Sequence, residues 1–355
     1  MTKMRLLKFS AAIFICLALF TSTGFYSPFQ EESKLQKYPM KLSEYALFTG
    51  NAAEQIPAEG VIPYELNTPL FTDYAEKLRF IKLPEGERAE YRNKGVLSFP
   101  ECTIIIKSFY YPVDKRSPEK GRRLMETRLL IHEAEGWKAV PYHWNEEQTE
   151  AYLEVAGGMK EVSWKDERGK KQKVNYVFPN MNQCKGCHSN DGEMTPIGPS
   201  AKQLNGEFSY EAGAENQRQL WDQHKLLAGM PEMGDIPIVP VWNEPASGSL
   251  DQRARAWLDI NCAHCHNPKG PASTTGLFLE YEETDQTALG LMKTPVAAGR
   301  GSGGLMHDIE PGKPDQSILY YRINSEDPGV MMPELGRKLI HKEGVSLIKE
   351  WIGSM

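Results

Sequence analysis

The feature that most constrains this chain is a five-residue frame, C-x-x-C-H, which occurs twice. The first copy is CKGCH, residues 184–188, and the second is CAHCH, residues 262–266. In a helical turn the three-residue step puts both thiols on one side, with the histidine beside the second. The fold must therefore present each frame in such a turn and leave space for the group that it holds.

Three chemistries use cysteines at this spacing. A thioredoxin-like site sits in a βαβ context and needs no following histidine. Structural zinc sites usually separate their cysteine pairs by about 15–20 residues, whereas 74 residues lie between Cys187 and Cys262. Attachment of a c-type haem requires two thiols for the vinyl groups and a histidine for the iron. We therefore expect two covalently bound haem c groups, with zinc binding and thiol redox chemistry as alternatives.

The two frames divide into anchors, ligands and one spacer. The predicted thioether anchors are Cys184, Cys187, Cys262 and Cys265, and the predicted proximal iron ligands are His188 and His266. His264 fills a slot that Lys185 or Gly186 fills in the first copy, so we expect it to be a solvent-facing spacer. Gly198-Pro199 and Gly270-Pro271 are candidate carbonyl partners for the other ring nitrogens of the proximal histidines.

The distal iron ligands are less constrained. For the second haem we predict Met332, because it precedes a proline in DPGVMMPELGRKL, just before the last predicted helix; Met331 is the alternative. For the first haem Met230, in AGMPEMG, shares the Met-Pro pair. Open alternatives for the first haem are Met194, Met233, His224 and an iron without a sixth protein ligand.

The N-terminus resembles an export signal. Lys3, Arg5 and Lys8 precede a ten-residue apolar run, 11–20, followed by small polar residues. That run is too short for a comfortable membrane span. We expect residues 1–24 to direct the protein to the periplasm, or to tether it peripherally to the membrane if they are not removed. The formal net charge of −6 gives no reason to expect binding to nucleic acid.

Residues 25–60 are polar and predict a lead-in segment, whereas residues 61–180 are rich in strand patterns. Candidate strands lie at 78–83, 103–111, 126–133, 137–144, 151–155 and 174–178. Turn signals separate these short strands, which favours an antiparallel sandwich or partial barrel. Cys102 precedes the second of them and is expected to be a buried thiol.

The pattern becomes helical after residue 181. We expect a first haem segment at 181–235, a proline-rich linker at 236–248 and a class I cytochrome c-like domain at 249–355. In the last domain a capping box, Ser249 and Gln252, opens the helix that leads into Cys262. This helix, which carries Trp257, should pack on the final helix, which carries Trp351. The predicted fold class is α+β and multidomain: an antiparallel β-rich domain followed by two mainly α cytochrome c-like haem domains.

Several segments resemble a family of exported bacterial dihaem c-type cytochromes. They include PYELNTPLFTDYAEKLRF, GRRLMETRLLIHE, GWKAVPYHWN, NQCKGCH and RARAWLDINCAHCHNPKGPA. The resemblance extends from about residue 61 onward. It implies haem attachment at both C-x-x-C-H frames and no firm distal ligand for the first haem.

Electron transfer between redox partner proteins is the leading functional hypothesis. A dihaem peroxidase-like oxidoreductase is the alternative enzyme, in which one haem collects electrons and the other binds peroxide. A third hypothesis makes the β-rich domain a binding module for a carbohydrate or polymer. Its candidate surface aromatics are Trp137, Tyr142, Trp144 and Trp164.

Overall fold

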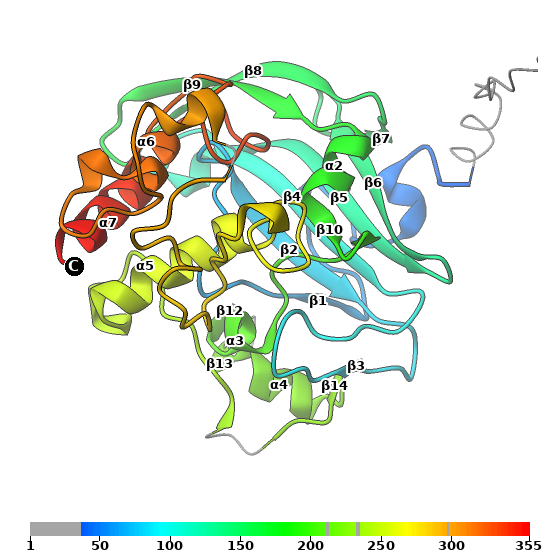
Figure 1. The fold of residues 1–355 in the computed structure, drawn as a ribbon. Helices are drawn as coiled ribbons and strands as arrows, with labels where there is room; N and C mark the ends of the chain where they lie inside the picture. Colours follow the sequence, from blue (N-terminus) through cyan, green and yellow to red (C-terminus); the bar gives the residue numbers. More distant parts are fainter. Residues whose placement is uncertain (1–36, 211–212, 232–234, 297) are drawn as a thin grey trace, which may run out of the picture. The chain divides into compact units, whose positions relative to one another are not determined.

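A six-stranded antiparallel sheet organises the part of the chain that this computed structural model describes, residues 37–210, 213–231, 235–296 and 298–355 (Figure 1). The strands, in sheet order, are β1 (Val61–Pro63), β2 (Glu76–Lys82), β4 (Ile104–Pro112), β5 (Arg122–Glu133), β6 (Gly136–Trp144) and β7 (Ala151–Leu153). Five of the six candidate strands coincide with β2 and β4–β7, which confirms the strand prediction there. The sixth coincides with β9, described below. The predicted signal segment, 1–24, lies outside the described residues.

One face of the sheet is apolar. Residues directly opposite one another on four successive strands form a buried row: Phe80, Ile106, Leu129 and Val140. Part of the predicted lead-in segment covers this face. The ring of Phe48 lies edge-on to Phe80, with 5.2 Å between centroids, and Tyr45 contacts Tyr142 in the same way at 5.8 Å.

The other face carries the rest of the molecule. A hairpin of β8 (Gly158–Lys165) and β9 (Lys171–Phe178) packs one end of this face through a buried cluster that includes Phe109, Tyr111, Trp164 and Tyr176. A second cluster, with Ile81, Ile105, Leu204 and Trp221, covers the other end. Between the two clusters the sheet face is open to the segments that carry the C-x-x-C-H frames.

The predicted surface aromatics of the β-rich segment lie mostly inside the protein. Tyr142, Trp144 and Trp164 are buried, and Trp137 is half-buried and stacks on His132. They therefore form no exposed binding surface. Cys102, by contrast, is exposed rather than buried, in a turn that precedes β4.

The helices are few and short. They are α2 (Met181–His188), α3 (Ala201–Leu204), α4 (Gln217–Gln223), α5 (Leu250–Leu258), the π-helical η6 (Asp259–Ala263), α6 (Ile318–Ile323) and α7 (Lys342–Gly353). Single 3₁₀ turns are η1 (Leu42–Tyr45), η2 (Ala52–Glu54), η3 (Pro118–Lys120), η5 (Pro245–Ser247), η7 (Ser273–Thr275), η8 (Gly299–Ser302) and η9 (Pro314–Gln316). Among the described residues, no helix combines the length and apolar content that crossing a membrane requires.

Three small strand pairs complete the fold. They are β3 (Ala89–Glu90) with β14 (Leu227–Ala228), β10 (Ser189–Asn190) with β11 (Glu193–Met194), and β12 (Glu207–Tyr210) with β13 (Gly213–Asn216). Only the first pair is parallel. The second pair follows the first C-x-x-C-H frame directly and positions the loop behind it.

The predicted fold class is wrong. Strand content exceeds helix content, and one large antiparallel sheet replaces the two mainly α cytochrome domains that we expected. The physical reason is visible around α2: this eight-residue helix follows β9 directly and packs on β6, so the sheet supplies the wall that helices would otherwise build. The region after η6 is largely loop, with α6 and α7 as its only α-helices in the described ranges.

The packing of α5 on α7 is confirmed. Ser249 and Gln252 form the predicted capping box at the start of α5. Trp257 of α5 and Trp351 of α7 share one buried cluster. Each indole nitrogen donates across the interface: Trp351 Nε1 to Asp251 Oδ1 at 2.8 Å, and Trp257 Nε1 to His341 Nδ1 at 3.0 Å.

The α5–α7 contact makes a testable prediction at Gly344. A Cβ there would overlap Trp257 Nε1 and lie 2.7 Å from His341 Nδ1. Gly344→Ala should therefore lower the free energy of unfolding by about 1–3 kcal/mol, although alanine normally favours a helix. Urea denaturation measures the change. Gly353→Ala, in the same helix with open space around it, should cost nothing; equal losses in both variants would contradict this packing.

Candidate functional site

The first C-x-x-C-H frame occupies α2. Asn180 caps this helix, because its side chain accepts from Gln183 N at 2.9 Å and its own backbone N–H donates to Gln183 Oε1 at 2.9 Å. Cys184 is buried, and Cys187 and His188 are half-buried on the following turn. The strand-like segment before the frame is β9, as predicted, so no long helix precedes the first frame.

His188 is held by the turn that follows it. Its Nδ1 lies 2.8 Å from the carbonyl oxygen of Thr195, which the β10–β11 pair brings back. A hydrogen bond from Nδ1–H to this carbonyl leaves the lone pair of Nε2 free for a metal. Burial lowers the pKa of His188 to about 3, so the ring is neutral. The predicted partner, Gly198-Pro199, is not the group that His188 contacts.

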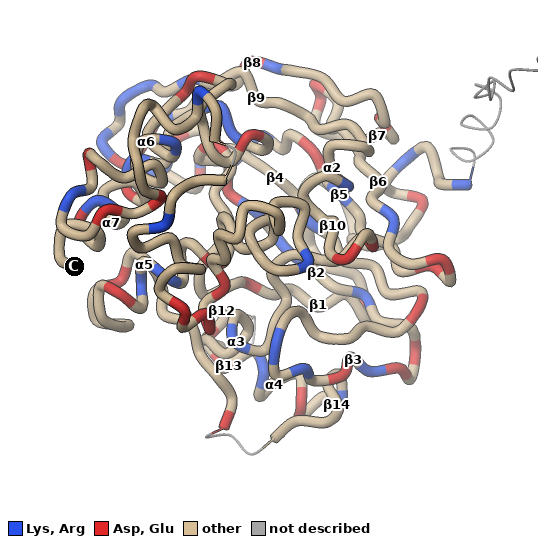
Figure 2. The backbone as a smooth tube through the Cα atoms, viewed as in Figure 1, with Lys and Arg blue, Asp and Glu red and all other residues tan. Residues whose placement is uncertain are grey.

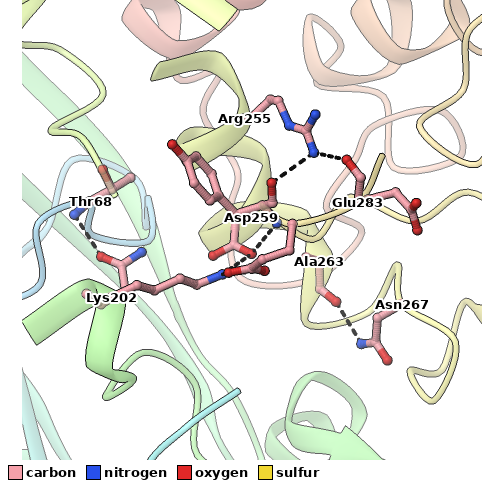
Figure 3. A network of polar contacts seen from close by, with 10 residues as sticks. Thr68, Lys202, Arg255, Asp259, Ala263, Asn267 and Glu283 are labelled. Carbon is pink, nitrogen blue, oxygen red and sulfur yellow. Dashed lines mark hydrogen bonds and ion pairs between the residues drawn. The ribbon is translucent and has the colours of Figure 1, made fainter. Parts of the chain in front are cut away.

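The second frame continues from α5 through the π-helical turn η6. Asn261 Nδ2 donates to Trp257 O at 2.9 Å. Asn267 Nδ2 donates to Ala263 O at 2.7 Å (Figure 3). A π-helical turn inside a helix often marks a functional site. Beyond the frame, His266 Nδ1 lies 3.5 Å from Thr275 Oγ1, so its neighbour is a threonine hydroxyl and not Gly270-Pro271.

A partly buried ion-pair network fixes the base of η6. Lys202 Nζ, from α3, lies 3.1 Å from Asp259 Oδ1 and 3.0 Å from Glu282 Oε1 (Figure 3). The same Asp259 oxygen accepts from Tyr281 N at 2.9 Å, and Arg255 Nη2 donates to the carbonyl groups of Tyr281 and Glu283. These contacts hold the second frame against α3, in the segment that follows the first frame.

The two frames are neighbours in space. Asp191, just after the first frame, donates its backbone N–H to Lys269 O at 2.8 Å, and its carboxylate lies 3.3 Å from Lys269 Nζ. Burial raises the pKa of Cys265 to about 12, and the nearby thiol of Cys187 adds to this shift. Segments that are far apart in the sequence therefore meet at one place.

A cavity opens in front of the first frame. Its volume is about 130 Å³ for water-sized occupants, within roughly 1210 Å³ of space between protein atoms that includes open solvent. Its walls come from the sheet face, from α2 with Cys184, Cys187 and His188, and from the α5–η6 segment. Lining residues from the second half of the chain include Trp257, Asn261, His264, Met332, Arg337 and His341. The lining is predominantly apolar, with a few charged groups, as in most cofactor sites.

Three cations cross the sheet behind this cavity. Arg79 on β2, Lys107 on β4 and Arg128 on β5 lie directly opposite one another in the strand register. Like charges in such positions destabilise a sheet. Arg79 and Arg128 have carboxylate partners, Glu65 and Glu126. We call Arg79, Lys107 and Arg128 the cationic row.

Lys107 is the exception in the cationic row. Within the described ranges its ammonium makes no hydrogen bond or ion pair; it lies 5.2 Å from the centroid of the Phe109 ring. Burial, reinforced by Arg79 and Arg128, lowers the pKa of Lys107 to about 7. Lys107 and Arg128 both line the cavity, which makes this wall suited to an anionic group. Elsewhere basic and acidic residues are interspersed along the chain (Figure 2).

Met332 lies where the sequence predicts a ligand loop. Its side chain lines the cavity and also packs on the apolar cluster of α5 and α7, as Cys262 does. The buried guanidinium of Arg337 fixes this loop. It donates to the carbonyl groups of Met332, Arg322, Ile323, Ser325 and Leu339. Met331, the alternative, is fully buried and does not line the cavity.

The other distal candidates lie elsewhere. Met230 packs beside Trp221 and Leu227, in the cluster at the far end of the sheet face, and is not among the residues that line the cavity. Met194 does not line it either, and His224 is exposed. Met233 falls outside the described residues. Among the described residues, none of the candidates that we named for the first haem lines the cavity of the first frame.

His264 is not the solvent-facing spacer that we predicted. Its ring is half-buried, lines the cavity together with Cys187 and His188, and also lines the adjoining cleft. The reason is the packing of the two frames on each other, which places the residues between Cys262 and Cys265 against the first frame. Asn261, which the sequence reasoning missed, is a second such residue: its Oδ1 accepts from Phe71 N at 2.9 Å and ties the frame to the β1–β2 loop.

Comparisons with models of protein families, with curated proteins and with solved structures give no match for this chain. Within the described ranges no group of three or more His, Cys, Asp or Glu side chains is arranged to hold a metal ion. All five described cysteines are free thiols.

The Arg337 contacts predict how the Met332 loop is held. Arg337→Ala leaves five backbone carbonyl groups without this donor, so the free energy of unfolding should fall by about 3 kcal/mol. Arg337→Lys should recover only part of this, because one ammonium cannot reach all five groups. Arg300→Ala, which removes an exposed ion pair with Asp327, should cost less than about 1 kcal/mol. Similar losses for Arg337→Ala and Arg300→Ala in urea denaturation would contradict this role.

Proposed function

We propose that this protein is an exported dihaem c-type cytochrome, which carries single electrons between redox partner proteins in the periplasm. The observation that carries the proposal is the convergence of two C-x-x-C-H turns, the first of which opens onto a mainly apolar cavity with a cationic wall. The resemblance to exported dihaem cytochromes supports the same conclusion. No partner is identified by the contacts of the described residues.

The residues of the first frame fit a covalently bound haem. Cys184 and Cys187 would carry the thioether bonds, and His188, with its Nδ1 next to the Thr195 carbonyl, would ligate the iron. A haem also brings two carboxylates. Lys107 is half-buried and has no carboxylate partner in the described chain, and Arg128 lies beside it. A nearby anionic group favours the protonated form of Lys107, whose pKa is lowered to about 7, so the pair would match the charge of the carboxylates.

The second frame has the corresponding parts. Cys262 and Cys265 would carry the thioether bonds, and His266 would be the proximal ligand. Met332 packs against the α5–α7 cluster, as Cys262 does, and its side chain also lines the cavity. It would be the distal ligand in this proposal. When bound, each haem supplies a one-electron iron couple. The chain orients the ligands, excludes water with Trp257 and Trp351 and keeps both proximal imidazoles neutral through burial.

Counting haems tests the proposal directly. The chain, expressed with haem-attachment machinery, should carry two covalent haems by mass spectrometry and by pyridine haemochrome absorbance. The double variants Cys184→Ser/Cys187→Ser and Cys262→Ser/Cys265→Ser should each carry one. Cys102→Ser, which removes an exposed cysteine outside both frames, should keep two. A wild-type chain without covalent haem would refute the proposed function.

Met332→Ala tests the distal ligand of the second haem. Thioether ligation raises a haem potential relative to a second imidazole or water. Its loss should lower the potential of one haem by on the order of 100 mV and remove the far-red absorption band of methionine-ligated ferric haem. Met331→Ala is the control, because Met331 is buried away from the cavity. If both the potentials and the band survive in Met332→Ala, Met332 is not the ligand.

A further inference from the structure

His264 occupies a position that its place in the second frame does not explain. It lies between the two thioether cysteines, so it takes no part in attaching the second haem. Its ring nevertheless lines the cavity of the first frame, with Cys184, Cys187 and His188. His264 also lines the adjoining cleft together with Cys187 and His188.

One nitrogen of the His264 imidazole lacks a partner in the described residues. Its Nδ1 is fully buried and makes no hydrogen bond to any residue in the described ranges. A buried polar atom without a partner costs about 1–3 kcal/mol, so such an atom calls for a ligand. In the tautomer that carries its proton on Nε2, the lone pair of Nδ1 is available for a metal.

The other histidine of the cavity is committed elsewhere. His341 Nδ1 accepts a hydrogen bond from Trp257 Nε1 at 3.0 Å. A neutral imidazole that accepts at Nδ1 carries its proton on Nε2, so neither nitrogen is free to bind iron. The ring of His341 also stacks on Phe71, with 4.2 Å between centroids. His341 thus has a structural role at the α5–α7 interface.

We propose that His264 is the distal ligand of the iron in the first haem, opposite His188. This inference rests on the proposed function. The step is the formation of one coordinate bond from an imidazole lone pair to the iron, without transfer of a proton or an electron. The first iron then has two protein ligands and no open position for peroxide, which favours a carrier over a peroxidase.

The ligand would also connect the two haems. His264 and Cys265 are adjacent in the chain, and Cys265 would carry a thioether bond to the second haem. A path from the first iron to the second porphyrin would then run through one imidazole, one peptide unit and one cysteine side chain. The backbone hydrogen bond from Asp191 to Lys269 keeps the two frames in this arrangement.

Spectroscopy of the full chain with both haems attached tests the inference. The ferric wild type should show one bis-imidazole haem and one imidazole–thioether haem by electron paramagnetic resonance and near-infrared magnetic circular dichroism. In His264→Gly, the bis-imidazole signal should be lost and one of the two haems should become high-spin, while added imidazole restores the low-spin signal. In His264→Met, the bis-imidazole bands should be replaced by imidazole–thioether bands, and the potential of that haem should rise.

Matched variants separate this inference from the proposed function. His224→Ala, which removes an exposed histidine, and His341→Phe, which removes the other histidine of the cavity, should both keep the bis-imidazole signal. A dihaem protein whose bis-imidazole signal survives His264→Gly would overturn the inference and leave the proposed function intact. A wild type with two haems and no bis-imidazole signal would overturn it as well, whatever the variants do. Absence of covalent haem would refute the proposed function itself.

Discussion

The cationic row is the constraint on which the arrangement of this protein depends. Three positive side chains on adjacent strands repel one another, and an antiparallel sheet tolerates such a row only if the charges are compensated. Glu126, which is fully buried, binds Arg128 and also accepts from Tyr176 Oη at 2.6 Å. Lys107 has no equivalent partner in the described residues. Burial and the two neighbouring guanidinium groups lower its pKa to about 7, so part of the repulsion is relieved by loss of its proton.

The cavity exists because distant segments close over that wall. Phe71 N donates to Asn261, and Asp73 Oδ1 accepts from the backbone N–H groups of Lys338 and Leu339, both at 2.7 Å. The short loop between β1 and β2 is thus tied both to the second frame and to the segment after Met332. A haem at the first frame would contact the sheet, the second frame and this segment at once. Its binding should therefore stabilise the whole described fold, in the way that any ligand of the native state does.

The local structure could largely be predicted from the sequence. Period-2 alternation located the central strands, and the Ser249–Gln252 box located the start of α5. The cationic row could not be predicted in this way. Arg79, Lys107 and Arg128 each interrupt an apolar strand, but the row forms only in the register of three strands.

Tertiary packing explains the errors. The fold class failed because C-x-x-C-H was taken to imply a helical domain, whereas the frame itself requires only one helical turn and a wall. For His264, comparison with Gly186, which occupies the same position in the first copy, suggested that this position needs no particular side chain. That comparison assumed that both frames meet the same surroundings. Gly186 lies near Leu335, whereas His264 lies against the other frame.

The packing of the two frames also bears on how electrons would move. In two separate haem domains, the rate of transfer between haems would depend on how often a linker brings them together. Here the Lys202–Asp259–Glu282 network and the Asp191–Lys269 contacts hold both frames within one compact unit, Pro39–Met355. Transfer between two such haems would require no domain motion. If His264 binds the first iron, this one residue sets both the ligation of that iron and the path to the second haem. Replacing His264 should then change both together.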